Sequence, residues 1–250
     1  MHVSMTEMKS ALRRCFEACG YFVGNYEDAA NMVLWLEKHG LNGLLELKAA
    51  MPYINSDSGK PLSTVIYEDS SSAIIDSQGR SALNCVAAAV DLAHAKALES
   101  GIATITVRNC HNRKFVLKAI TDCGRRGISA VAYWQNGSSS ISEHTAAIKA
   151  GERYPAYSEA TTALAPNPDD DEHQSLTIIC SSRIDLSSSL QHSKGNRHAQ
   201  SVDSRQIELN KEHAVDMGFD VDEALWNEIN EVGNRVLVES SEQSRMGAGA

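Results

Sequence analysis

The residues best suited to chemistry in this sequence are gathered in one short segment, 108–114. The candidates within it are Arg108, His111, Asn112, Arg113 and Lys114. The segment follows a run typical of a buried strand and opens a predicted helix, and α/β folds bind ligands where strand ends and helix starts converge. Its cations would suit a carboxylate or phosphate, with arginine offering a bidentate fork. The alternative is a polar surface turn that faces water.

One imidazole and one thiol in this segment could react. His111 could change charge near neutral pH and act as a general acid or base. The alternative is a structural imidazole that makes one hydrogen bond at a helix start. Cys110 would need thiolate stabilisation from Arg108, Lys114 and the helix start to act as a nucleophile. The six cysteines lack CxxC pairs, which favours buried structural thiols in a reducing compartment.

Two other polar segments are weaker candidates. In the tail, Ser241, Ser244 and Arg245 could close over an anionic ligand, and the alternative is a disordered terminus. His192 and His198 flank a Lys-Gly-Asn-Arg loop without Cys, Asp or Glu at ligand spacing, so no metal site is predicted. The sequence contains no GxGxxG, Walker, HExxH or GxSxG motif.

A strand–helix–strand unit should position the 108–114 segment. The predicted strands are 64–67, 73–75, 102–107, 128–134 and 176–180, and the predicted helices among them are about 83–99 and 114–122. Strand, helix and strand with short connections form a crossover unit, whose apolar strands are buried on both faces. The fold class is therefore α/β, a mixed sheet with flanking helices.

Helical spacing dominates the N-terminal fifth of the chain. Three helices are predicted there. The first follows a capping box of Ser4 and Glu7, the second runs from Asn25 to a stop at Gly40, and the third runs from Leu44 to Met51, before Pro52.

The secondary-structure signal weakens over 135–175, which is rich in Ser, Gly, Pro and Asp. We expect one domain, 1–250, with these parts: a helical cluster (1–52), a mixed α/β core (60–182), a mobile loop (187–204), and a C-terminal helix with tail (220–250) capped by Asp220 and Glu223.

Charge and hydropathy exclude several classes of protein. Lys and Arg number 23 against 32 Asp and Glu, a net charge of −9, so nucleic acid is not an expected partner. No apolar run approaches the roughly 20 residues that span a bilayer, and the first residues contain no apolar signal region. We expect a cytoplasmic protein that binds neither nucleic acid nor membrane.

Residues 87–137 resemble the central segment of the malate/L-lactate dehydrogenase superfamily of NAD(P)-dependent oxidoreductases. Both have a long helix, a Gly-Ile strand, a Val-Arg-Asn turn, a second helix and a second strand, and the resemblance extends over roughly 4–140. The whole chain also resembles an uncharacterised bacterial family of unknown function. That resemblance rests on Trp35 to Leu41 and on the ending Ser241, Glu242, Ser244 and Arg245 before Gly247 to Ala250.

The sequence departs from the dehydrogenases at the residues that carry their chemistry. The family's Arg-Gly-Ile-Asp-Ser-His-Gly turn aligns with 39–45, where Leu44 replaces the catalytic histidine and cannot exchange a proton. His39, at its start, is expected to bond free carbonyls at a helix C-terminus. The family's second histidine aligns with Asn112, one place after His111, and its following glycine with Lys114.

Two functions stay open on this basis. The first is a divergent malate/L-lactate dehydrogenase-like protein that acts on or binds a small anionic metabolite (a hydroxy, oxo or imino acid), as an NAD(P)-dependent oxidoreductase with altered chemistry. The second is a catalytically inactive binding or assembly protein on the same scaffold, which Leu44 favours. The resemblance implies NAD or NADP as the cofactor and a homodimer as the assembly.

Overall fold

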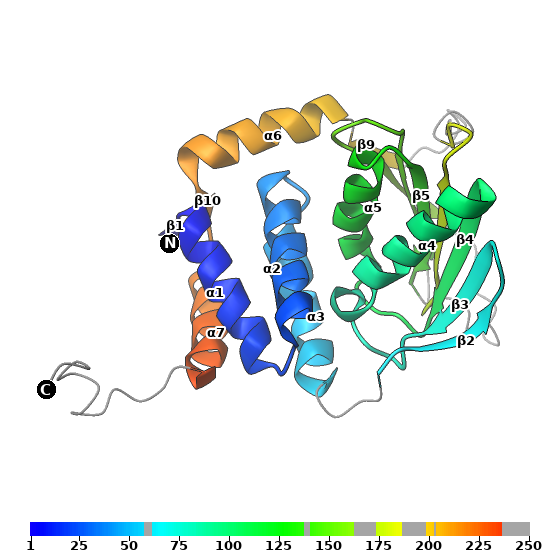
Figure 1. The fold of residues 1–250 in the computed structure, drawn as a ribbon. Coiled ribbons are helices and arrows are strands. Elements are labelled where there is room, and N and C mark those ends of the chain that lie inside the picture. Colours follow the sequence, from blue (N-terminus) through cyan, green and yellow to red (C-terminus); the bar gives the residue numbers. More distant parts are fainter. Residues whose placement is uncertain (58–61, 138–140, 163–173, 187–198, 203, 237–250) are drawn as a thin grey trace, which may run out of the picture.

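The fold consists of a group of helices beside an α/β layer (Figure 1). The computed structural model describes residues 1–57, 62–137, 141–162, 174–186, 199–202 and 204–236. The helical group is formed by α1 (Met5–Ala18), α2 (Val23–Lys38), α3 (Gly43–Asp57) and α7 (Glu223–Gly233). The layer contains one large sheet with α4 (Val86–Ser100) and α5 (Val116–Arg125). The predicted mixed α/β fold with flanking helices is confirmed.

The large sheet is mixed and has the strand order β2-β3-β4-β8-β5-β6-β7-β9. Its strands are β2 (Thr64–Glu68), β3 (Ser72–Asp76), β4 (Ile102–Arg108), β5 (Ser129–Asn136), β6 (Ile141–Ile148), β7 (Ala156–Thr162), β8 (Leu176–Ser181) and β9 (Ala199–Val202). β4 and β5 both run antiparallel to β8, which lies between them. They therefore run parallel to each other, as a crossover through α5 requires, and end at the same edge of the sheet.

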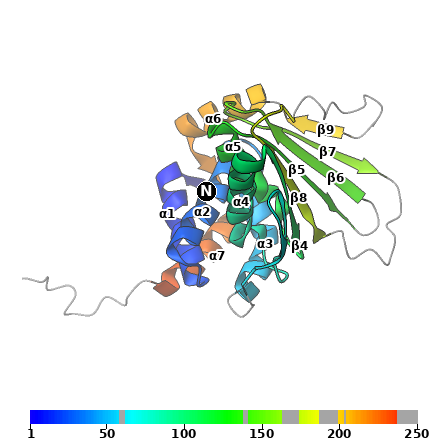
Figure 2. The same ribbon diagram turned by 45° about the vertical axis from the view of Figure 1, so that its right-hand side comes forward.

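Helices α4 and α5 cover one face of this sheet (Figure 2). On that side α5 buries Leu117 and Ile120, because its apolar residues recur at spacings of three and four. Along β4, Ala103, Ile105 and Val107 are buried while the residues between them are not, the period-two pattern of a strand. The packing of α4 and α5 against one face of the sheet fixes the position of β4, and with it the start of the 108–114 segment.

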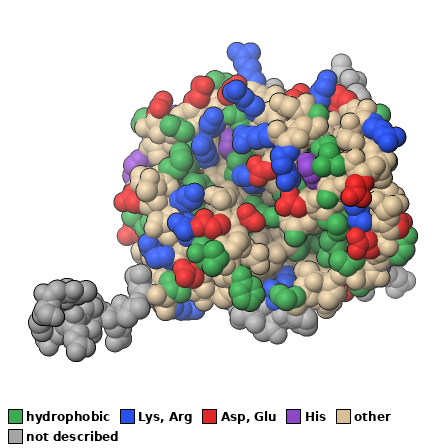
Figure 3. Space-filling view, in the orientation of Figure 1, with side chains coloured by type: hydrophobic (Ala, Val, Ile, Leu, Met, Phe, Trp, Pro, Cys, Tyr) green, Lys and Arg blue, Asp and Glu red, His purple; other side chains and the backbone are tan. Residues whose placement is uncertain are grey.

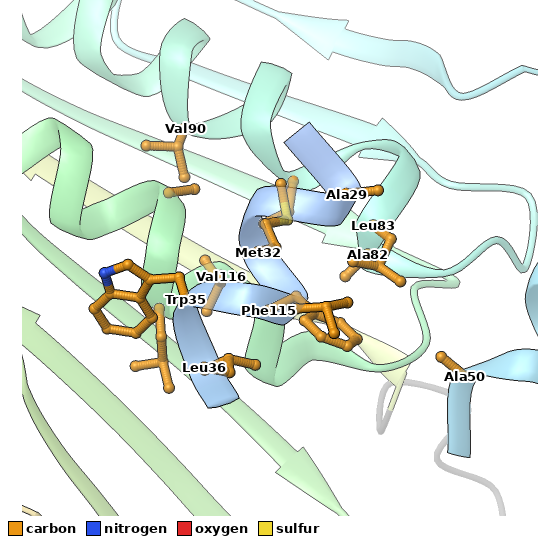
Figure 4. Packing of buried hydrophobic residues seen from close by; sticks show 14 of the residues in the cluster. Ala29, Met32, Trp35, Leu36, Ala50, Ala82, Leu83, Val90, Phe115 and Val116 are labelled. Carbon is orange, nitrogen blue, oxygen red and sulfur yellow. The ribbon is translucent and has the colours of Figure 1, made fainter. Parts of the chain in front are cut away.

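Helix α2 is the central helix of the molecule. Its buried residues occupy every side of the helix: Ala29, Ala30, Met32, Val33, Leu34, Trp35 and Leu36. A helix that is apolar all round must be covered all round. Figure 4 shows its residues packed among side chains of the α/β layer, including Leu83, Val90, Phe115 and Val116. The helical group and the α/β layer thus share one hydrophobic core.

The N-terminus pairs with a segment from the last part of the described chain. The predicted capping box is present: the Ser4 Oγ accepts from the Glu7 amide at 3.3 Å, and a Glu7 carboxylate oxygen accepts from the Ser4 amide at 2.9 Å. β1 (His2–Val3) pairs antiparallel with β10 (Phe219–Asp220), which precedes α7. This pairing joins the segment before α1 to the segment before α7, although the two are more than 200 positions apart in sequence.

The strands within 135–175 were not predicted. β6 and β7 lie there, and β6 buries His144, Ala146 and Ile148 on alternate positions. The polar first half of β6, Ser142 to Thr145, and the adjacent buried Ala147 obscure this period-two pattern in the sequence. Further along the chain, β9 occupies part of the segment 187–204 that was predicted to be a loop, and α6 (Ser204–Met217) follows it. Residues 187–198 lie outside the described residues.

Two helix boundaries also differ from the prediction. α3 does not end before Pro52 but continues to Asp57. A proline inside a helix costs about 3 kcal/mol, and burial of apolar side chains on both sides of it, including Leu47 and Ile54, offsets that cost. The cap of α7 is Asp222, which accepts from the Leu225 amide at 2.9 Å. Asp220, the predicted cap, lies in β10 instead.

Candidate functional site

A cavity of about 430 Å³ lies at the edge of the sheet where β4 and β5 end. Its walls come from α3, from the turn after β4, from the end of β5, and from β6 and β7. Four of the predicted site residues line it: His111, Asn112, Arg113 and Lys114. The strand-to-helix segment that the sequence singled out is therefore one wall of a concave site.

Local backbone geometry sets the direction of these side chains. Asn109 and Asn112 have φ values of 51° and 56°, in the left-handed region that asparagine tolerates better than most residues. Between them, the His111 amide donates to the Arg80 carbonyl at 3.0 Å, and the His111 carbonyl accepts from the Ala82 amide at 2.7 Å. Hydrogen bonds on both sides of His111 therefore fix the backbone of the turn, and the side chains of residues 111–114 line the cavity.

Arg113 links three segments around the cavity. Its Nη1 donates to the Cys110 carbonyl (3.1 Å) and to Gln174 Oε1 (3.0 Å), and its Nη2 donates to the Gln135 carbonyl (2.9 Å) and to Asn136 Oδ1 (2.5 Å). The residue is only 5% exposed. Because both terminal nitrogens already donate to the protein, the bidentate fork expected of this arginine is not open to a ligand. Arg113 holds the wall and supplies a buried positive charge.

Lys114 joins the turn to the helical group. Its Nζ lies 3.0 Å from a Glu46 carboxylate oxygen on α3 and 5.8 Å from the centre of the Tyr157 ring on β7. The two charged side chains are 17% and 27% exposed, so the ion pair is partly shielded from water. Lys114 is the more exposed of the two lining cations and is the one positioned to contact a ligand.

A second histidine, His144 on β6, lines the cavity as part of a hydrogen-bonded chain. Since Asn136 Oδ1 accepts from Arg113, its amide nitrogen faces His144 Nε2, at 3.0 Å. Nε2 is then the acceptor, and the network assigns the imidazole proton to Nδ1, which donates to the Tyr157 hydroxyl at 2.8 Å. That hydroxyl donates in turn to Glu159 at 3.3 Å.

His144 is buried against an aromatic ring and is held neutral. It is 5% exposed, and its ring stacks on the Trp134 indole with centroids 4.9 Å apart and an interplanar angle of 1°. Burial lowers the pKa of His144; Glu159 opposes this shift, and Lys114 and Arg113 add to it. At neutral pH the imidazole is therefore uncharged, in agreement with its role as acceptor and donor in the chain.

His111, the predicted acid or base, stacks on Tyr53 of α3. The two ring centroids are 4.1 Å apart and the rings are inclined by 22°. His111 is partly exposed and lines the cavity, in contrast to the buried His144. Its side chain can thus meet a ligand, and its role as acid or base stays a prediction.

The remaining predicted residues lie away from the cavity or outside the described residues. Arg108 is exposed at the end of β4, paired in register with Asp76, and is not in the cavity lining. Ser241, Ser244, Arg245, His192 and His198 lie outside the described residues.

Cys110, the candidate nucleophile, is a buried thiol. Cys110 is fully buried, and the neighbouring Cys85 thiol together with burial raises the pKa of the Cys110 thiol, which opposes a nucleophilic role. All six cysteines are free, and all but Cys19 are buried, as predicted for structural thiols.

Leu44, at the position that the resemblance assigns to the catalytic histidine, belongs to the core. It is 6% exposed, and its amide donates to a Glu37 carboxylate oxygen at 2.8 Å. α3 faces the cavity with Glu46, Ala49 and Tyr53, so a residue two positions before Glu46 points away from it. Five residues earlier, His39 bonds the Trp35 carbonyl through Nδ1 at 2.6 Å, which confirms the prediction of a helix C-terminal residue that interacts with free carbonyls.

Several other residues that line the cavity were not predicted from the sequence. They are Glu46, Tyr53, Asn136, His144, Tyr157 and Glu159. Those on α3 follow the helical spacing of 46, 49 and 53, which required the helix to continue past Pro52. Those on β6 and β7 occupy alternate positions of their strands, a signal present in the sequence but weakened by the polar residues around it.

Other kinds of site were not found in the described part of the chain. No group of three or more His, Cys, Asp or Glu residues there could hold a metal ion. None of the described helices has both the length and the apolar character needed to cross a bilayer. On the face shown in Figure 3, basic and acidic side chains are interspersed.

One protein-family model matches the N-terminal part of the chain. Residues 3–94 match the model of a family described as "Protein of unknown function (DUF3726)", which bears out the resemblance to an uncharacterised family over that part of the chain. No curated protein matches the sequence.

Several solved structures share the fold. Malate dehydrogenase from Pyrococcus horikoshii OT3 superposes with a TM-score of 0.69 at 13% identity, over 96% of this chain and 97% of that one. Malate dehydrogenase from Entamoeba histolytica gives 0.68 at 12%, over 94% and 97%. Delta1-piperideine-2-carboxylate reductase from Pseudomonas syringae pvar. tomato gives 0.64 at 14%, over 93% and 99%. At such identities the likeness shows a dehydrogenase-like fold and no more.

Proposed function

We propose that this chain binds a small anionic metabolite, a hydroxy, oxo or imino acid, in the 430 Å³ cavity on its dehydrogenase-like scaffold. The observation that carries the proposal is a concave site that combines Lys114, the buried charge of Arg113 and the partly exposed His111. Cavities of roughly 300–1,000 Å³ with a few convergent polar groups are typical of small-molecule sites. The site therefore has the size and the polarity for an acid of this class.

The ligand carboxylate would lie near Lys114. The buried guanidinium of Arg113 adds positive potential to the cavity, because its hydrogen-bond acceptors are neutral and do not cancel its charge. The partial positive charge at the start of α5 acts in the same direction. His111, stacked on Tyr53, would exchange a proton with the hydroxyl, carbonyl or imine of the ligand.

The nicotinamide cofactor implied by the resemblance does not fit the residues at this helix start. A pyrophosphate approaches a helix N-terminus closely where small residues leave the backbone accessible. Here Arg113, Lys114 and Phe115 form a 3-10 turn directly before α5, and Arg113 and Phe115 are buried. We assign the cavity to the acid alone and derive no step through NAD or NADP.

A non-catalytic binding or assembly protein is the second candidate function. The specific observation in its favour is Leu44, a core residue where the family has its proton-exchanging histidine. This alternative predicts that the chain binds the acid without converting it.

Both candidate functions include the homodimer implied by the resemblance. Sedimentation of the purified chain tests whether it is a dimer.

Ligand-dependent thermal unfolding distinguishes these possibilities. A panel of 2-hydroxy, 2-oxo and imino acids should raise the melting temperature by mass action. Lys114→Gln should abolish the response, whereas Lys118→Gln, on α5 beside Asp122, should keep it. Loss of reduced nicotinamide absorbance with any acid would establish an oxidoreductase. If no acid raises the melting temperature, the proposal is wrong.

A further inference from the structure

Four charged side chains line the cavity, but only two of them pair with each other. Lys114 and Glu46 form an ion pair at 3.0 Å. Arg113 contacts neutral acceptors, and no carboxylate of the described residues forms an ion pair with it. Within the same residues, the nearest basic group to Glu159 is the neutral imidazole of His144, 3.8 Å away. One positive and one negative charge are therefore left over.

The two unmatched charges lie at opposite ends of one wall. Arg113 bonds Asn136, Asn136 bonds His144 Nε2, and the Nδ1 side of His144 faces Glu159 and the Tyr157 hydroxyl. The imidazole ring separates the two ends. The wall thus presents a positive pole on the side of the 108–114 turn and a negative pole on β7.

From this arrangement we infer that the ligand is a zwitterion, an amino or imino acid with a protonated nitrogen beside its carboxylate. The inference rests on the proposed function and narrows its ligand class. The carboxylate faces the Arg113 and Lys114 end, and the nitrogen faces Glu159. A zwitterion presents a negative group to Arg113 and Lys114 and a positive group to Glu159. A hydroxy or oxo acid offers Glu159 no group of opposite charge and gives the cavity a net negative charge, which disfavours it.

Matched acids that differ only at one atom test the inference by isothermal calorimetry. The pairs are proline with tetrahydrofuran-2-carboxylate, pipecolate with tetrahydropyran-2-carboxylate, and alanine with lactate. In each pair the first member carries the positive nitrogen and the second an oxygen. We expect the zwitterion to bind about tenfold more tightly, and pyrrolidine, which lacks the carboxylate, not to bind.

A pair of isosteric variants locates the effect. Glu159→Gln should reduce the preference for the zwitterion about tenfold without weakening the oxygen acid. The control is Glu143→Gln, beside His144 on β6 but facing the opposite side of the sheet, where it contacts Gln135 and Tyr133. It should leave both affinities unchanged.

The failures of the two proposals are distinguishable. Equal or tighter binding of the oxygen acids would overturn the zwitterion while leaving an acid-binding site. Equal weakening of both acids in Glu159→Gln would likewise show that this carboxylate does not select the nitrogen. If no acid of any pair binds, the proposed function fails together with the inference.

Discussion

Replacing Arg113 by methionine tests whether its buried guanidinium organises the cavity wall. Two of its four acceptors are the backbone carbonyls of Cys110 and Gln135, which cannot turn to another donor. Each buried acceptor left without a partner costs about 1–3 kcal/mol. The other two, Gln174 and Asn136, are side-chain amides that can rotate, so they add little.

The opposing contribution is the desolvation of the charge itself. Burial lowers the pKa of the Arg113 guanidinium, which means that the folded state bears a cost for this charge that methionine would remove. Subtracting part of that cost from the lost hydrogen bonds leaves a net destabilisation of about 3 kcal/mol. For a chain of this size the melting temperature should fall by roughly 6–12 °C.

Urea unfolding followed by tryptophan fluorescence measures this loss. Arg126→Met is the control, because Arg126 is 43% exposed and pairs with Asp91 at the surface, where such pairs contribute about 0–1 kcal/mol. An Arg113→Met protein as stable as the Arg126→Met protein would refute the structural role. The variant also releases the Asn136 amide, so the titration of His144, followed by NMR, should change in Arg113→Met and not in the control.

Three other perturbations have definite expected outcomes. Burial lowers the pKa of His39 to about 4 from 6.5. As the pH drops, the imidazole of the unfolded chain is therefore protonated before that of the folded chain, and the free energy of unfolding falls between pH 6.5 and pH 4. The loss is roughly 3 kcal/mol, at about 1.4 kcal/mol per pH unit. His39→Gln should flatten that part of the stability curve in urea titrations, and equal slopes would contradict the assignment. A Cβ on Gly43 would lie 2.2 Å from the Val33 carbonyl oxygen, so Gly43→Ala should destabilise the fold by at least about 1–3 kcal/mol. Gly24 lies in α2 with open space around it, so Gly24→Ala should stabilise the fold by about 0.5–1 kcal/mol. If both variants shift the melting temperature in the same direction, the α2–α3 packing is wrong. Leu44→His should lower stability and create no dehydrogenase activity, since the side chain faces the core; activity gained by this variant would show that position 44 reaches the cavity.

The segment that lines the candidate site could be predicted from the sequence because it depends on a local change of pattern. An apolar strand that ends at Arg108 and a helix that starts by Val116 force a turn between them, and the polar residues of that turn lie at a sheet edge. The fold class followed from the same alternation of strand and helix patterns. These features depend on neighbours in sequence, which is why composition and spacing were sufficient.

The opposite wall could not be predicted, because it is made by strand pairing. His144 and Glu159 are 15 positions apart but are register partners on β6 and β7. Their segment is polar enough to resemble a loop, and only the partner strands show which alternate positions are covered. Tyr53 was missed for another reason: the sequence pattern at Pro52 predicts an end to α3, and the burial of Ile54 overrides it.

Leucine at position 44, where the dehydrogenases that this chain resembles have a histidine, does not leave the cavity without an imidazole. Two imidazoles line it, and they differ in what they can do. Both ring nitrogens of His144 are engaged with Asn136 and Tyr157, so this residue shapes and holds the wall. His111 is partly exposed, its backbone is hydrogen-bonded on both sides and its ring stacks on Tyr53, so the proposed exchange of a proton with a ligand is assigned to His111 rather than to His144. A group that exchanges protons must touch the ligand, and the turn after β4 lines the cavity in which we propose that the ligand binds, whereas Leu44 does not line it.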